Sequence, residues 1–122
     1  MAGVFELKHK NKTILCLDIS NLMVQDKPEI NKHVECAKEK IQSHPPKSVL
    51  VLTNVTMTRF DREISGIITD YAKHNTPYVK ASAIVGLLGL QRVILQAVKT
   101  FTGRDFYLAT TIDEALEWLV KQ

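Results

Sequence analysis

The sequence holds few residues whose types and spacing could support chemistry, and the histidines are the first to consider. All four are predicted to lie on turns or exposed helix positions: His9, His33, His44 and His74. A metal site needs several ligands close together, such as two histidines at i, i+4 or a histidine beside cysteine and carboxylate ligands. None of the four meets either condition. We therefore expect no metal, and we expect no other cofactor.

A short glycine motif, Gly86-Leu87-Leu88-Gly89, follows a predicted strand and opens a predicted helix. Phosphate-binding loops at such a position have a third glycine or end in Gly-Lys-Ser/Thr, because their backbone N–H groups and side chains surround the phosphates. Both features are missing here, so the motif is interpreted as a tight strand-to-helix turn. The Gly-x-Ser-x-Gly motif of serine hydrolases is also missing. We expect a protein that is not an enzyme.

Asp18 and the two cysteines are the remaining reactive side chains. A phospho-acceptor aspartate would need further acidic residues and a lysine at later strand ends, and Lys80 comes too early in its strand. Asp18 is therefore expected to accept hydrogen bonds from loop amides. Cys16 and Cys36 lack the spacing of a metal or redox motif, which predicts buried or half-buried free thiols in a reducing compartment.

The stretch from residue 47 to residue 72 is predicted to be a buried strand, a polar loop and an amphipathic helix. The strand begins as a continuous apolar run, which favours a strand covered on both faces. Thr58 and Asp61 have the spacing of a capping box at a helix start. Since ligand and partner sites in α/β sheets gather where strand carboxyl ends meet helix amino ends, this loop is the predicted working surface.

Thr58 has two interpretations at this stage. It is either a helix cap, which contributes on the order of 1 kcal/mol, or a phosphorylation point. A phosphate at a helix amino end would meet free N–H groups and a favourable dipole. Asp61 would oppose the added charge, and Arg59 and Arg62 would partly offset that repulsion.

Hydrophobic periodicity and turn residues predict the order β-β-α-β-α-β-α-β-α. The strands are expected over residues 4–8, 13–19, 48–53, 78–85 and 106–109, and the helices after Asp26 and over 60–73, 90–101 and 111–120. Asp26 and Thr111 are predicted to cap the helices that they begin, and Pro45 is predicted to end the first helix. The polar residues 9–12 predict an antiparallel hairpin with its first strand at a sheet edge. Each later unit is strand, loop and helix, which favours parallel strands. The fold class is thus α/β, a mixed sheet with about four helices.

Composition limits the remaining possibilities. With 122 residues, 45% hydrophobic and 24% charged, the chain is expected to form one globular domain over 1–122. The net charge of +3 is mild and dispersed, so a nucleic acid partner is not expected. No apolar run approaches the roughly 18 residues of a membrane span, and no leader segment is evident. We expect a cytoplasmic protein.

The order of elements and the position of the loop resemble the STAS domain of sulphate transporters and anti-sigma-factor antagonists, within the wider CRAL-TRIO-like fold group. The resemblance extends over nearly the whole chain, and the segment from residue 78 onward is similar to small stand-alone bacterial proteins of this group. It implies a non-enzymatic regulator that binds a kinase or anti-sigma-type partner. Phosphorylation at the central helix start would control that binding.

The family's motif at that helix start is Asp-Ser-Ser/Thr-Gly-Leu, whereas residues 57–61 here are Met-Thr-Arg-Phe-Asp. The match is by position, and it points to Thr56 or Thr58 as phospho-acceptor. The predicted partner surface therefore consists of Asn54, Thr56, Thr58, Arg59 and Arg62.

Four apolar residues suggest an alternative function. They lie in predicted loops: Met57, Leu87, Leu88 and Leu90. Apolar pockets with few polar groups are the usual sites for small molecules, so this group predicts a lipid or small-molecule cavity. The same residues would instead form a homodimer interface if they are exposed as a patch.

Overall fold

A five-stranded mixed sheet forms the centre of the computed structural model, which describes residues 3–87, 92, 93, 96, 99 and 106–122. The strands lie in sequence order: β1 (Gly3–His9), β2 (Lys12–Asp18), β3 (Val49–Asn54), β4 (Val79–Val85) and β5 (Tyr107–Ala109). β1 is antiparallel to β2, and β2 to β5 are mutually parallel. The predicted edge hairpin, parallel strands and mixed sheet are confirmed.

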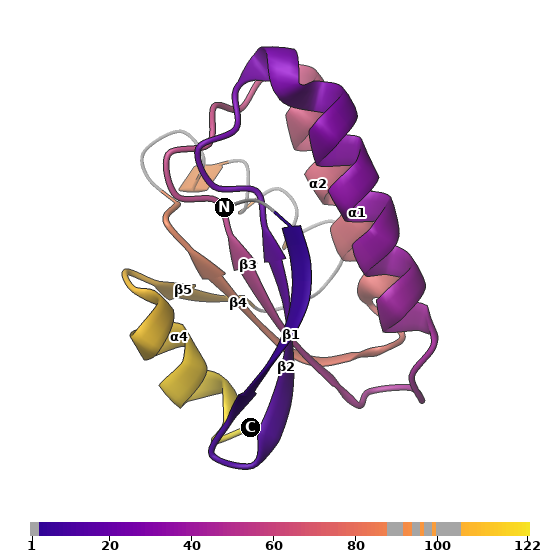
Figure 1. Cartoon of the computed structure of the whole chain (residues 1–122), viewed down its shortest axis with the longest axis vertical. Helices are drawn as coiled ribbons and strands as arrows, with labels where there is room; N and C mark the ends of the chain where they lie inside the picture. Colours follow the sequence, from indigo (N-terminus) through magenta and orange to yellow (C-terminus); the bar gives the residue numbers. More distant parts are fainter. Residues whose placement is uncertain (1–2, 88–91, 94–95, 97–98, 100–105) are drawn as a thin grey trace.

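The helices cover both faces of this sheet. α1 (Lys27–Gln42) and α2 (Arg62–Asn75) lie side by side on one face, and α4 (Ile112–Leu119) lies on the other (Figure 1). A short 3-10 turn, η1 (Val24–Asp26), leads into α1. The described residues thus contain three α-helices rather than about four. The helix expected over 90–101 falls mostly outside the described residues.

Side chains on the strands alternate between two hydrophobic cores. In β2, Leu15 and Leu17 face α1 and α2, whereas Ile14 and Cys16 face α4. β3 alternates in the same way, and every one of its residues is buried, as predicted for a strand covered on both faces. Each fully buried aliphatic side chain contributes roughly 1.5–3 kcal/mol of hydrophobic free energy. Hydrophobic packing on both faces of the sheet therefore fixes the positions of β2 and β3.

Two predicted helix caps have different outcomes. The Thr111 hydroxyl accepts a hydrogen bond from the Glu114 backbone N–H (3.1 Å), so the cap predicted for α4 is confirmed. Asp26 stands at the predicted cap position of α1, but its carboxylate accepts from the Met23 N–H (2.8 Å). The prediction that Asp26 caps α1 with its side chain was wrong, because the preceding 3-10 turn brings a nearer donor to the carboxylate.

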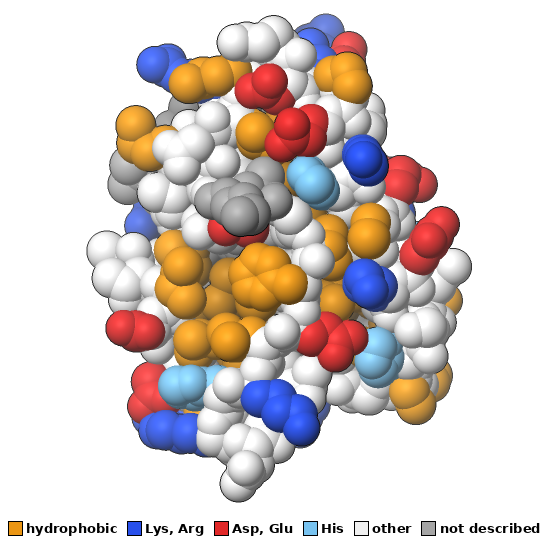
Figure 2. Space-filling model, in the orientation of Figure 1, with side chains coloured by type: hydrophobic (Ala, Val, Ile, Leu, Met, Phe, Trp, Pro, Cys, Tyr) orange, Lys and Arg blue, Asp and Glu red, His pale blue; other side chains and the backbone are white. Residues whose placement is uncertain are grey.

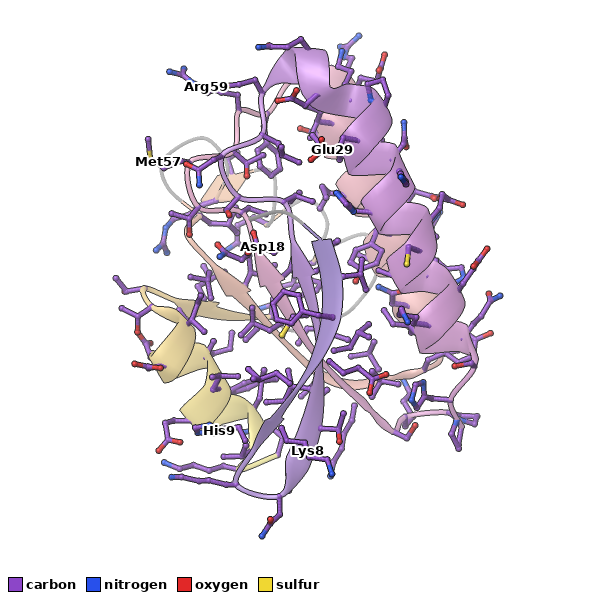
Figure 3. The ribbon with its side chains drawn as sticks, in the orientation of Figure 1. Lys8, His9, Asp18, Glu29, Met57 and Arg59 are labelled. Carbon is purple, nitrogen blue, oxygen red and sulfur yellow. The ribbon has the colours of Figure 1, made fainter. Side chains whose placement is uncertain are left out.

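An ion-pair cluster joins the β1–β2 hairpin to α4. Glu117 accepts from the Lys10 ammonium group through one carboxylate oxygen and contacts the His9 imidazole through the other, both at 2.6 Å. Acidic, basic and histidine side chains gather where the hairpin meets α4 (Figure 2), and His9 lies beside that helix (Figure 3). The Lys10 hydrogen bond, followed by that of His9, lowers the pKa of Glu117 from 4.5 to about 2.

Replacing Lys10 by glutamine is expected to raise the pKa of Glu117 back toward 4.5, as measured by NMR titration of its carboxyl group. Because the pKa is lowered in the folded state, the pair stabilises the fold fully above pH 4.5 and loses its effect as pH falls toward 2. Lys12→Gln is the matched control, since Lys12 donates to the Gln122 carbonyl instead (3.2 Å). An equal shift in both variants would contradict the assignment.

Candidate functional site

The carboxyl ends of β2 and β3 form two copies of the same turn, side by side. In β3, the Asn54 side-chain oxygen accepts from the backbone N–H (3.0 Å) and hydroxyl (2.6 Å) of Thr56. In β2, Asp18 accepts the equivalent pair from Ser20, at 2.9 and 2.5 Å. Asp18 and Asn54 are direct neighbours in the parallel ladder. The predicted role of Asp18 as a strand-end acceptor for loop groups is confirmed.

Backbone hydrogen bonds join the two loops that follow these strands. The Asn21 N–H donates to the Thr56 carbonyl (2.9 Å), and the Arg59 N–H donates to the Leu22 carbonyl (3.0 Å). The loop from β3 to α2 (residues 55–61, hereafter the β3–α2 loop) is therefore hydrogen-bonded to residues 19–23, and the two segments form one surface. Residues 19–23 thus belong to this surface, which was not predicted from the sequence.

The two candidate phospho-acceptors lie in different environments. Thr58 is only 3% exposed, and its hydroxyl donates to the Ile19 carbonyl (2.7 Å). Thr56 is exposed, with its hydroxyl directed to Asn54. The predicted capping role of Thr58 was wrong: α2 begins at Arg62, and the Asp61 carboxylate accepts from the Ile64 N–H (2.8 Å). The Thr58 hydroxyl does not cap the helix because it is hydrogen-bonded to Ile19, which lies 39 positions earlier in the sequence.

Gly86 fixes the other side of the β3–α2 loop. It follows β4 with φ +93°, a backbone conformation that favours glycine. A Cβ at this position would lie 2.4 Å from the Thr56 hydroxyl oxygen and 2.6 Å from the Thr56 Cα. The first glycine of the Gly86–Gly89 motif thus serves close backbone packing, as its interpretation as a tight turn predicted.

The charges around the β3–α2 loop form one structural cluster and leave two arginines exposed. Lys27, at the start of α1, pairs with Asp61 (2.7 Å) and Glu63 (3.5 Å) at the start of α2. The hydrogen bond from the Ile64 N–H, followed by that from Lys27, lowers the pKa of Asp61, and the hydrogen bond that Lys27 donates to Asp61 raises the pKa of Lys27. Arg59 and Arg62 are exposed. The positive charge available to a partner therefore belongs to these arginines.

Of the four apolar residues proposed as one group, the structure describes Met57 and Leu87, and of these two only Met57 is exposed. Met57 is 68% exposed with φ +60°, an uncommon conformation for a non-glycine residue. Figure 3 shows Met57 and Arg59 projecting from the same end of the molecule, beyond Asp18. Leu87 is buried in the core facing α1 and α2, so its expected place in an exposed loop was wrong. Leu88 and Leu90 lie outside the described residues.

The described ranges also contain the free thiols of Cys16 and Cys36. No group of three or more potential metal ligands occurs there, and no described helix is long and apolar enough to cross a bilayer. Burial raises the pKa of the Cys16 thiol to about 11, so this thiol stays protonated. Cys16 is buried as predicted, whereas Cys36 is exposed, contrary to the expectation of burial.

This sheet, with its antiparallel hairpin, parallel strands and loop packed between the ends of β2 and β4, has the fold of a STAS-like domain. It is similar to an uncharacterised protein with a SpoIIAA-like fold from Shewanella loihica, with a TM-score of 0.66, 19% identity and coverage of 98% of this chain and 95% of that one. It is also similar to an anti-sigma factor antagonist from Mycobacterium paratuberculosis, with a TM-score of 0.55, 14% identity and coverage of 96% and 92%.

No protein-family model and no curated protein matches the sequence. The common feature of the two similar structures and this chain is the fold. The resemblance inferred from the sequence is confirmed at that level.

Proposed function

We propose that this protein is a cytoplasmic, non-enzymatic regulatory module that binds a protein partner through the β3–α2 loop and the start of α2. The partner would be a kinase or an anti-sigma-type regulator, by analogy with the anti-sigma factor antagonist of similar fold. The exposed surface consists of Thr56, Arg59 and Arg62, and the predicted site residues Asn54 and Thr58 are its buried support.

The observation that carries this proposal is an exposed loop held in one conformation from three directions. The Asn54 side chain accepts a hydrogen bond from the loop's Thr56 N–H, and the Leu22 carbonyl after β2 accepts one from the loop's Arg59 N–H. Gly86, after β4, packs against the loop from the other side. A preorganised loop loses little conformational entropy on binding, which favours affinity. Exposed, well-supported polar loops are common sites of protein recognition.

Phosphorylation is proposed at Thr56 rather than Thr58. Thr56 is exposed, whereas Thr58 is buried and its hydroxyl donates to the Ile19 carbonyl. A phosphate on Thr56 requires its hydroxyl oxygen to leave Asn54 and to turn away from Gly86, against which it packs. A phosphate on Thr56 would add up to two negative charges close to Arg59. Since the helix start is already occupied by Asp61, that added charge would act mainly on the partner and on the exposed arginines.

Charge reversal of Arg59 or Arg62 to glutamate is expected to weaken the complex by about tenfold each, since rim charge pairs contribute modestly and reversal adds repulsion. The partner would be isolated by pull-down from the cells of origin, and its affinity measured by calorimetry. Arg62→Glu should leave the fold stable, because Arg62 is the first residue of α2, where negative charge suits the helix dipole.

Lys121→Glu provides a control with the same change of charge at the far end of α4, in an exposed position. Equal affinities for the native chain and both arginine variants would remove the β3–α2 loop from the interface. Equal weakening by Lys121→Glu would show a general charge effect instead of a local surface.

The exposed Met57 favours one alternative, a lipid or other small apolar ligand bound beside the β3–α2 loop. A pocket of about 100 Å³ lies at the opposite end of the sheet, near His44 and Ser48, so it does not serve this alternative. Mass spectrometry of protein from its own cells separates the two functions. Extra mass only under native conditions would favour the ligand, and a phosphoryl group mapped to Thr56 would favour the regulatory switch.

A further inference from the structure

The two edges of the sheet differ in a way that points to a second interaction surface. β5 is an edge strand of three residues, whereas β1 is an edge strand of seven residues whose one neighbour in the described sheet is β2. Proteins usually keep edge strands short or cover them, because their free N–H and C=O groups pair with other strands. β1 is therefore the edge at which strand addition is possible.

Hydrophobic side chains gather over the middle of β1. Phe5 is 47% exposed and Leu7 is half-buried, and both lie on the α4 side of the sheet, opposite Cys16 and Ile14 of β2. Figure 2, seen with β1 on the near side, shows this hydrophobic area between α1 and α4, with charged side chains at its margin. An apolar area beside a free strand edge is what an added strand would cover.

The charges on β1 select a partner strand and a register. Glu6 and Lys8 are exposed, lie on the same face, and have opposite signs. Charged residues normally protect an edge from pairing. A second copy of β1, added antiparallel with Leu7 opposite Leu7, places each Glu6 opposite the Lys8 of the other copy. The same register places Phe5 opposite His9.

Neighbouring registers lack this match. Moving the two-fold axis to Glu6 or to Lys8 places like charges directly opposite, which is destabilising. Moving it to Phe5 places Glu6 opposite Val4, so that Glu6 and Lys8 no longer face each other. A two-fold axis placed between two residues would pair a side chain on one face of the sheet with a side chain on the other face, because side chains alternate along a strand.

We propose that β1 forms an antiparallel pair with β1 of a second copy of this chain, around a two-fold axis at Leu7. Two five-stranded sheets then join into one continuous sheet. Because β1 runs antiparallel to its copy, β2 and β3 of one copy run antiparallel to those of the other, and their carboxyl ends point in opposite directions along the strands. Both β3–α2 loops remain accessible, so this dimer is independent of the function proposed above.

A charge-swap series tests the pairing. Sedimentation velocity over low-micromolar to near-millimolar chain is expected to show a monomer–dimer equilibrium for the native protein. Glu6→Lys and Lys8→Glu should each raise the dimer dissociation constant by about tenfold or more, since each turns two symmetry-related attractive pairs into repulsive ones. The double variant Glu6→Lys/Lys8→Glu should return to within about threefold of native, because it restores both pairs in reversed order.

Lys32→Glu and Glu39→Lys are matched controls, because they make the same charge changes at exposed positions of α1. Thermal unfolding of every variant separates lost pairing from lost folding. A native chain that stays monomeric throughout the range would overturn the proposal. So would a double variant that remains as weak as the single ones.

Cysteine cross-linking tests the register directly in a Cys16→Ala/Cys36→Ser background, which removes the exposed native thiol and the buried thiol that lies opposite residue 5 in β2. Residues directly opposite in an antiparallel pair have Cα atoms about 4.5 to 5.5 Å apart, within the roughly 4.4 to 6.8 Å that a disulfide spans. Leu7→Cys should therefore give a covalent dimer under mild oxidation. Phe5→Cys should not, since the two Phe5 positions would be offset by about 13 Å along the strands. Cross-linking through residue 5 alone would overturn the register.

Discussion

Replacing Gly86 by alanine is expected to lower the free energy of unfolding by roughly 3 kcal/mol or more, the combined effect of backbone strain and overpacking. The strain arises because alanine disfavours the φ of +93° at this position. The overpacking arises because the new Cβ would lie 2.6 Å from the Thr56 Cα. Either the end of β4 or the β3–α2 loop must then move, so partner binding through the loop should weaken as well.

Gly66→Ala is the control for this variant. Gly66 lies within α2, and a Cβ there would meet no atom within 4 Å. The change is expected to stabilise the protein by about 0.5–1 kcal/mol, because alanine favours helix over glycine. Urea unfolding measures both variants. Native-like stability of Gly86→Ala would contradict the close contact between the loop and β4.

The layers of the fold were predictable from the sequence because they depend on local periodicity. The continuous apolar run of β3 predicted burial on both faces, and the structure buries each residue of that strand. The Thr111 cap and the break at Pro45 likewise depend on neighbours within a few residues. Such signals survive folding when no distant group competes for the same atoms.

The start of α2 shows where this reasoning fails. Thr58 and Asp61 are both of residue types that cap helices, and the spacing of a capping box favours Thr58. The choice is made by the Ile19 carbonyl, which accepts from the Thr58 hydroxyl across 39 positions of sequence. Asp61 is then free to bond to the Ile64 N–H. A tertiary contact of this kind leaves no local trace.

A repeated sequence motif indicates part of this site. An apolar strand followed by an acidic or amide residue, one apolar residue and a hydroxyl residue occurs twice, at residues 18–20 and 54–56. Side chains of this type bond to the backbone two residues ahead, and both copies do so. Since the two strands are parallel neighbours, the repeat could have identified residues 19–23 as part of the same surface.

The contrast between Thr56 and Thr58 is the second large effect expected. Thr58→Asp should lower the free energy of unfolding by about 3 kcal/mol or more, because it leaves an uncompensated charge in a buried position. The new carboxylate would also face the Ile19 carbonyl oxygen, which now accepts from a hydroxyl. Thr56→Asp should cost less, about 1 kcal/mol, because the exposed residue loses only the hydrogen bond that its hydroxyl donates to Asn54.

Urea unfolding of both aspartate variants, with Thr58→Ser as a third, tests this contrast. Thr58→Ser keeps the hydroxyl and should cost only about 1 kcal/mol for the lost methyl group. The deficit of Thr58→Asp should shrink in acidic buffer, because burial raises the pKa of a carboxyl group and the protonated form can donate to the Ile19 carbonyl. A stable Thr58→Asp protein at neutral pH would mean that the loop opens readily around residue 58. Phosphorylation at Thr58 would then compete with phosphorylation at Thr56 as the regulatory event.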